Sequence, residues 1–202
     1  MTIYDLKPKF QNLLRPICMK LANNGVTANT VTVASIALSF IGGLCVFFAK
    51  SSFVLLWLVP IILFIRMALN AIDGMLAREH DMKSPEGAIL NELGDVISDA
   101  FLYLPFAYLF GVSPELVVIL VIASIIVEMV GVVAVQIGAS RRYDGPFGKS
   151  DRAFIFGLIA ILLAAGIAPG TWLNLLLIAC ILLSVFTTIK RAKNALKELK
   201  EQ

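Results

Sequence analysis

Long apolar runs separated by short polar stretches organise most of this sequence. Each run is close to the roughly 20 residues that an α-helix needs to cross the hydrocarbon core of a bilayer. We expect the fifth run, which is short, to begin before Ala153, with Ser150 as N-cap and Asp151 in the first turn. The pattern predicts six spans, at Val31–Ala49, Phe53–Ala77, Gly87–Phe110, Pro114–Ala139, Ala153–Gly166 and Thr171–Ile189.

The N-terminal segment follows a different pattern. Apolar side chains recur there among lysines and an arginine, at a spacing typical of a helix that lies in the plane of the membrane interface. We expect Pro8 and Pro16 to interrupt this helix. The sequence therefore predicts an interfacial amphipathic helix over residues 1–25, followed by an all-α integral membrane domain with six transmembrane helices over residues 26–202.

The composition supports this class. Of the 202 residues, 59% are hydrophobic and the mean hydropathy is +0.89, which excludes an ordinary soluble protein. Lys and Arg gather in the loops on one side of the predicted spans, and the opposite loops hold only Lys50 as a cation. Because cytoplasmic loops carry this excess, we expect both termini in the cytoplasm. The basic face should attract anionic lipid headgroups and phosphorylated solutes, and we expect no nucleic-acid partner.

Carboxylates and amides are concentrated in the second and third apolar runs. Spacings of three and four residues align them on one face of each helix. A short turn over residues 79–83 joins the two helices as antiparallel neighbours, so these faces can meet at a similar depth. The two faces consist of Arg66, Asn70 and Asp73 in the second span and of Asn91, Asp95 and Asp99 in the third.

Oxygen atoms that converge from two membrane helices indicate a cation site. Charged side chains at membrane depth are costly unless they are paired, hydrated or coordinated, so they are candidates for function. A structural salt bridge between the helices is the alternative. The oxygen ligands, with His80 in a polar loop, favour Mg²⁺ or Mn²⁺ over Zn²⁺. Mg²⁺ held by few protein ligands usually binds substrate phosphates as well.

A short motif runs through this polar region and consists of Asp73, Gly74, Ala77, Arg78, Gly87 and Asp95. Its spacing resembles the signature of the CDP-alcohol phosphotransferases, membrane enzymes that make phospholipids from CDP-linked donors. The resemblance extends over nearly the whole chain, from the interfacial helix through the six spans. Two of the four acids of the family signature are replaced here, by Asn70 and Asn91.

The resemblance implies transfer of a phosphatidyl group from CDP-diacylglycerol to a small alcohol, with release of CMP. It also implies a homodimer embedded in the inner membrane of a bacterium. Asp95 and Asp73 would be the catalytic residues, with Asp95 as general base. The nucleotide would bind beside Gly74, Ala77, Arg78 and Gly87. The metal ligands would be Asp73 and Asp95, with Asn70, Asn91 and Asp99 as further candidates.

The two asparagines leave the number of metal ions open. In the family, the four acids hold a pair of divalent ions against the pyrophosphate of the donor. Asparagine offers a carbonyl oxygen but no negative charge. Either one ion suffices, or Asp99 or Glu92 compensates from a neighbouring position, or the protein has lost activity and only binds the CDP-lipid.

A basic segment before the fifth span is a candidate site for the alcohol acceptor. Guanidinium groups match phosphate oxygens well, so a phosphorylated polyol such as glycerol 3-phosphate would suit it. The alternative is that these charges only set the topology. Glu128 and Gln136 are expected to face the same polar cavity or to bond between helices. The candidate acceptor residues are Arg141, Arg142, Lys149 and Arg152.

A transporter is the rival function, because it would also place carboxylates inside a helical bundle. Against it, the acids gather at the cytoplasmic ends of the spans, and the outer halves are nearly free of ionisable groups. The sequence therefore favours a transferase whose chemistry takes place near one membrane surface.

Overall fold

The structure, a computed structural model, describes residues 3–201, with side chains from residue 8 onward. Residues 1 and 2 of the predicted interfacial segment lie outside this range. Within it, every regular element is helical, as predicted. The elements are α1 (Ile3–Asn23), α2 (Ala28–Phe48), η1 (Phe53–Trp57), α3 (Leu58–Glu79), α4 (Pro85–Tyr103), η2 (Leu104–Tyr108), α5 (Pro114–Gln136), α6 (Lys149–Ala164) and α7 (Thr171–Glu201), where η marks a 3₁₀ helix.

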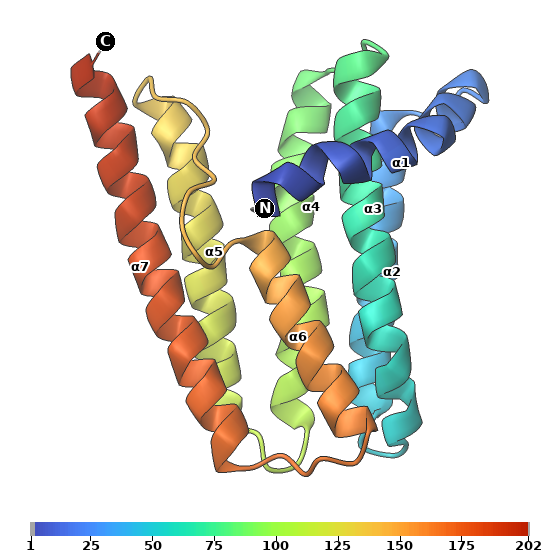
Figure 1. Cartoon of the computed structure of the whole chain (residues 1–202), viewed down its shortest axis with the longest axis vertical. Coiled ribbons are helices and arrows are strands. Elements are labelled where there is room, and N and C mark those ends of the chain that lie inside the picture. The colour runs from blue at the N-terminus through green and yellow to red at the C-terminus, as the bar shows by residue number, and fades with distance from the viewer. Residues whose placement is uncertain (1–2, 202) are drawn as a thin grey trace.

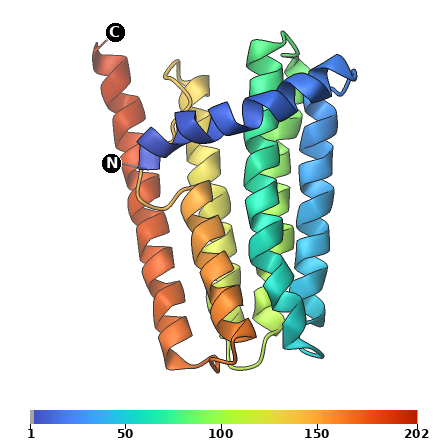
Figure 2. The same cartoon turned by 45° about the vertical axis from the view of Figure 1, so that its right-hand side comes forward.

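Helices α2 to α7 run side by side in one bundle, and α1 lies across one end of it (Figures 1 and 2). The connections over residues 80–84 and 137–148 and the C-terminus lie at that end, which we call the basic end. Arg15 fixes α1 there by donating hydrogen bonds of 3.1 and 3.0 Å to the carboxylate of Glu79, the last residue of α3. The interfacial helix is thus tied to the helix that carries Asp73.

Side chains at the helix starts explain several boundaries. Thr27 caps α2 by accepting a hydrogen bond from the amide of Thr30. Ser84 accepts from the amide of Gly87 at 2.9 Å, and Pro85 then occupies the first helical position of α4. Ser113 and Pro114 begin α5 in the same way. Pro114 is the predicted start of the fourth span, whereas α2 and α4 begin three and two residues before the predicted Val31 and Gly87.

The start of α6 and the two prolines of α1 also differ from the prediction. Helix α6 begins at Lys149 with Gly148 as N-cap, not Ser150, because the carboxylate of Asp151 reaches back to the amide of Gly148 at 2.8 Å. Pro8 and Pro16 do not interrupt α1, which continues as one helix through both. A proline removes only one backbone hydrogen bond and can be accommodated by a bend.

Four segments in the described range are long and apolar enough to cross a membrane, by length and composition. They are Ala28–Phe48, Phe53–Glu79, Pro114–Gln136 and Thr171–Glu201. Helix α6 has only 16 residues, and α4 carries four carboxylates, so neither meets the same criteria. The two helices nevertheless run within the same bundle (Figure 1).

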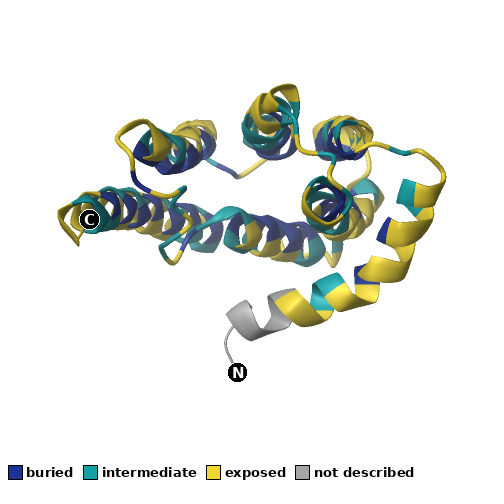
Figure 3. Ribbon diagram, turned by 90° about the horizontal axis from the view of Figure 1, so that it is seen from above, coloured by how far each residue is buried: buried dark blue, intermediate teal, exposed yellow. Residues whose placement is uncertain are grey.

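The burial pattern fits an apolar solvent around the bundle. Buried residues line the inner faces of the helices, and exposed residues cover the outer faces (Figure 3). The exposed residues include large apolar side chains such as Phe64, Ile122 and Leu182. An outer surface this apolar is stable in lipid and would aggregate in water. The structure is therefore that of a membrane protein.

Helix α2 packs against both α3 and α4 and holds them as a unit. Gly43 is the point of closest approach to α4, because a Cβ atom there would overlap the backbone carbonyl of Phe101. Glycine is needed at this position to let the two backbones meet. Arg66, Asp73 and the polar face of α4 are brought together by this packing.

We expect Gly43→Ala to lower the free energy of unfolding by about 1–3 kcal/mol, because the added methyl group must push α2 away from α4. Thermal unfolding of the protein in detergent would measure the loss. Gly170→Ala is the matched control, since a Cβ there meets nothing within 4 Å. Equal stability of the two variants would contradict the close packing of α2 on α4.

Candidate active site

Two pairs of side chains bridge α3 and α4 reciprocally. Asn91 of α4 donates a hydrogen bond of 3.3 Å to Asp73 Oδ2 of α3, and Asn70 of α3 donates one of 3.3 Å to Asp95 Oδ1 of α4. Each carboxylate therefore accepts from the asparagine of the opposite helix. The structure brings together four of the five predicted metal-site residues, and the two asparagines orient the two acids.

Helix α2 supplies a third side to this cluster. Thr32 Oγ1 lies 3.0 Å from Asp73 Oδ2, and Ser35 donates to the side-chain oxygen of Asn70 at 2.8 Å. The sequence analysis did not identify these two residues. Their signal was present: Thr32, Ser35 and Ser39 form a small polar stripe at helical spacing in a span that is otherwise apolar.

Asp73 retains an oxygen that could bind a cation. The side chain is buried, yet Oδ1 has no hydrogen-bond partner among the described residues. A buried carboxylate oxygen without a partner is costly, and a cation would remove that cost. No group of three or more acidic, histidine or cysteine side chains in the described range could share an ion. The donor set thus fits a hard ion held by few protein ligands, with Mg²⁺ or Mn²⁺ as the natural choice.

The start of α6 lies deep in the bundle. The connection over residues 137–148 runs down from the basic end before α6 begins (Figure 1). This brings Lys149, the first residue of α6, to Asp95 of α4, and the ammonium group forms an ion pair with Asp95 Oδ2. Lys149 was predicted as an acceptor residue, and the structure places it beside the proposed base.

Asp99 belongs to a different cluster. Arg66 of α3 and Arg152 of α6 each approach its carboxylate to 2.8 Å, and both guanidinium groups are buried. These two ion pairs engage both oxygens of Asp99, which does not join Asp73 and Asp95. The expectation that Asp99 compensates for a missing metal ligand, and that Arg152 contacts the acceptor, is at odds with this geometry.

Glu128 of α5 is the centre of that second cluster. Its carboxylate accepts from Arg141 at 3.1 Å, from Arg152 at 3.0 Å and from Arg191 of α7 at 3.2 Å. Glu128 is buried, as expected, whereas Gln136 is exposed and does not face the polar interior. Arg191 was predicted only as a topology charge, and no local pattern pointed to its long-range contact. We call Arg66, Asp99, Glu128, Arg152 and Arg191 the buried charge network.

Arg141 connects Glu128 of the buried charge network to Glu92 of α4. It donates to the two carboxylate oxygens of Glu92 at 2.9 and 2.8 Å, and it lies over the ring of Tyr143. Gly131 makes room for it, since a Cβ there would overlap the guanidinium group. The carboxylates beside Arg141 raise its pKa further, although burial alone would lower it. Glu92 is therefore engaged as well and is not available as a substitute metal ligand.

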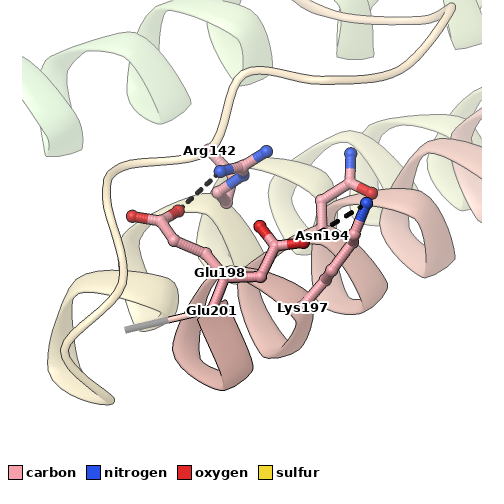
Figure 4. A pocket seen from close by; sticks show the side chains of 5 residues that line it. All are labelled: Arg142, Asn194, Lys197, Glu198 and Glu201. Atoms are coloured by element: carbon pink, nitrogen blue, oxygen red, sulfur yellow. Dashed lines mark hydrogen bonds and ion pairs between the residues drawn. The ribbon is translucent and has the colours of Figure 1, made fainter.

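Arg142 lies at the surface of the basic end. It donates to both oxygens of Asp144, at 2.7 and 2.8 Å, and to Glu198 of α7 at 2.7 Å. Burial would raise the pKa of Asp144, but the hydrogen bonds from Arg142 hold it below its usual value. The shallow pocket beside this cluster, shown in Figure 4, is lined by Arg142, Asn194, Lys197, Glu198 and Glu201. Arg142 thus lies apart from the other predicted acceptor residues.

The predicted nucleotide residues lie beside Asp73, toward the end of α3 and the start of α4. The guanidinium group of Arg78 folds back over Gly74, where a Cβ would lie 3.0 Å from Nη2. Arg78 is exposed and forms no ion pair with a described residue. Gly87 leaves room for the side chain of Asn29, whose Oδ1 would lie 2.6 Å from a Cβ at that position. Ala77 is half-buried.

Comparisons with known proteins agree with this architecture. A family model described as CDP-alcohol phosphatidyltransferase matches residues 25–190. The inner membrane protein YnbA of Escherichia coli (strain K12) is 48% identical over 196 residues, which cover 97% of each chain.

Solved structures share the fold. Crystal structures of the Mycobacterium tuberculosis phosphatidylinositol phosphate synthase PgsA1 superpose with a TM-score of 0.73 for the form with CDP-DAG bound, at 21% identity over 89% of this chain and 92% of that one. The form in complex with manganese and citrate gives 0.72, at 22% identity over 89% and 87%. The family model covers most of the sequence, including the whole motif from Asp73 to Asp95, and the resemblance inferred from that motif is confirmed: the chain belongs to the CDP-alcohol phosphatidyltransferase family.

Proposed function

We propose that this protein transfers the phosphatidyl group of CDP-diacylglycerol to the hydroxyl group of a small phosphorylated alcohol and releases CMP. The observation that carries the proposal is the pair of bridged carboxylates, Asp73 and Asp95, with one buried oxygen of Asp73 that has no partner among the described residues. In a membrane bundle, such a pair beside a basic end suits chemistry on a lipid diphosphate.

The two acids have separate roles in the proposed reaction. Asp73 would hold the divalent ion, which would supply charge neutralisation for the diphosphate. Asp95 accepts the proton of the attacking hydroxyl group. The hydroxyl oxygen forms a bond to the lipid-side phosphorus, and the bond between that phosphorus and the oxygen of CMP breaks. Asn70 orients Asp95, and the ion pair with Lys149 stabilises its carboxylate form.

The position of the site constrains the rest of the protein. Arg78 is exposed beside Gly74 and suits the nucleotide phosphates. We propose six spans, with α4 and α6 crossing inside the bundle because their charges are paired there, and with both termini at the cytoplasmic face of a bacterial inner membrane. A homodimer is proposed from the family resemblance.

The acceptor is proposed to be a phosphorylated polyol such as glycerol 3-phosphate. All four predicted acceptor residues pair with carboxylates: Arg142 with Glu198 near the surface, and Arg152 with the buried Asp99. Lys149 pairs with the proposed base Asp95 itself, and Arg141 pairs with Glu92, three residues before Asp95 on α4, so we choose these two for the acceptor. A single phosphate group would suit these two cations better than an uncharged alcohol.

The purified protein, given CDP-diacylglycerol, Mn²⁺ and a panel of alcohols, tests the proposal. We expect CMP release that depends on one phosphorylated alcohol, with the matching phospholipid as product. Absence of CMP across the panel, with donor still bound, would favour a relative that only binds the CDP-lipid. Uptake of a labelled solute into vesicles without CMP release would favour a transporter.

Thr32→Val is expected to reduce turnover by about tenfold, because a residue that orients a metal ligand commonly contributes that much. Valine has nearly the same shape but cannot donate to Asp73. The rate of CMP release at several Mn²⁺ concentrations would show a higher requirement for the ion. Thr30→Val is the matched control, since Thr30 is exposed and bonds only near the helix cap. Equal Mn²⁺ requirements in the two variants would contradict the role of Thr32.

A further inference from the structure

The polar cluster has a charge pattern that the sequence motif does not show. Asp95 is bound on one oxygen by Asn70 and on the other by the ammonium group of Lys149. Asp73 is bound only on Oδ2, and its Oδ1 has no partner in the described part of the chain. The two acids are therefore unequal: one is already neutralised by a cation of the protein, and the other is not.

The asparagines do not restore the negative charge of the two missing acids. The side-chain oxygen of Asn70 accepts from Ser35, and its amide nitrogen donates to Asp95. The amide nitrogen of Asn91 likewise faces Asp73. Both residues act as hydrogen-bond donors to the acids, and neither adds negative charge.

The two acids that could have substituted are also engaged. Asp99 lies between Arg66 and Arg152, each at 2.8 Å. Glu92 lies on Arg141, also at 2.8 Å. Neither carboxylate is available to hold a second ion near Asp95, because removing it would leave buried or half-buried guanidinium groups without a partner.

We propose that this centre holds one divalent ion, at Asp73, and that the Lys149 ammonium group takes the place of a second ion at Asp95. The inference rests on the proposed function, because it assigns the charges that face the donor diphosphate. Two dications at a site with one unpaired carboxylate would repel each other four times as strongly as two unit charges at the same distance. A lysine supplies a single positive charge and repels the ion at Asp73 only half as strongly as a second dication would at the same distance, and it is fixed by the start of α6.

This arrangement also assigns Lys149 a part in the reaction. Its ammonium group lies beside the oxygen of Asp95 that would receive the proton of the acceptor, so it can offset the negative charge of the diphosphate on that side. The ion at Asp73 offsets the other side. Asn70 and Asn91, which replace two acids of the family signature, remove two negative charges. The proposed replacement of one dication by Lys149 removes positive charge to match.

Counting bound Mn²⁺ by electron paramagnetic resonance, on the full-length protein in detergent with CDP-diacylglycerol present, tests the proposal. We expect one Mn²⁺ per chain in the wild type. Lys149→Met should bind that ion about tenfold more tightly, because a neighbouring cation is removed, while CMP release falls. If Lys149 had only a structural role, Lys149→Met would lower both the affinity for Mn²⁺ and the rate of CMP release. Lys83→Met is the control, an exposed lysine in the α3–α4 connection, and should match the wild type.

The triple variant Asn70→Asp, Asn91→Asp, Lys149→Met should bind two Mn²⁺ per chain and show the spectral broadening of a coupled pair. The proposal would be overturned if the wild type bound two Mn²⁺ ions or none. It would also be overturned if Lys149→Met bound Mn²⁺ as tightly as the wild type or more weakly. One ion in a folded triple variant would do the same. If the triple variant does not fold, Lys149→Met decides the question. Failure of the proposed function would give a different result: the wild type would bind one Mn²⁺ but release no CMP with any acceptor.

Discussion

Asp95→Asn is expected to lower the rate of CMP release by about 1000-fold. Asparagine has the same shape and can keep the contact with Asn70, but it cannot accept the proton of the attacking hydroxyl, and general base catalysis contributes about 100- to 10,000-fold. Lys149 also loses its carboxylate partner. The measurement is CMP release at saturating CDP-diacylglycerol and acceptor. The affinity for the donor should change much less than the rate.

Glu86→Gln provides the control for this loss. Glu86 lies in the first turn of the same helix and is exposed, so its removal should change the rate less than twofold. An Asp95→Asn protein that keeps its rate within tenfold of the wild type would show that another group accepts the proton.

Glu128→Gln is expected to destabilise the protein by about 3–5 kcal/mol, the cost of breaking a buried ion pair by removing one partner. Glu128 is the carboxylate that Arg141, Arg152 and Arg191 share, so its loss leaves three guanidinium groups with too little negative charge. The midpoint of unfolding in detergent would fall strongly. Because this change acts on the fold, activity should be lost at a lower temperature than in the wild type.

The control for this second change lies on the same helix. Glu115 is exposed at the start of α5 and accepts a hydrogen bond from Ser113, so Glu115→Gln should cost less than about 1 kcal/mol. If Glu128→Gln were as stable as Glu115→Gln, the buried charge network would contribute nothing to the stability of the bundle.

The helical spacing of polar residues predicted the part of the site that lies within one helix or between two helices joined by a short connection. Asn70 and Asp73 share a face because they are three residues apart, and a short connection brings that face to Asn91 and Asp95 of the next helix. Thr32 was missed although its position could have been read in the same way. Ser and Thr in an apolar helix commonly bond to a backbone carbonyl of their own helix, and only the structure shows that Thr32 also lies beside Asp73.

The pairing of distant charges could not be predicted in this way. Lys149, Arg152 and Arg191 are far along the chain from Asp95, Asp99 and Glu128, and each arginine or lysine could have met any of these acids. The choice depends on the depth at which α6 begins, which the connection over residues 137–148 sets (Figure 1). Hydropathy gives the length of that apolar run but does not locate it along the bundle.

The buried charge network also has a consequence for how the chain is inserted. Its five members come from five helices, α3 to α7, so each of these helices would expose an unpaired charge if it entered lipid by itself. While the ribosome is still making α6, Arg66, Asp99 and Glu128 are present and Arg191 is not. Helices α3 to α6 must therefore be held together during biogenesis until α7 arrives, and a chain truncated before Arg191 would be a target for quality-control proteolysis.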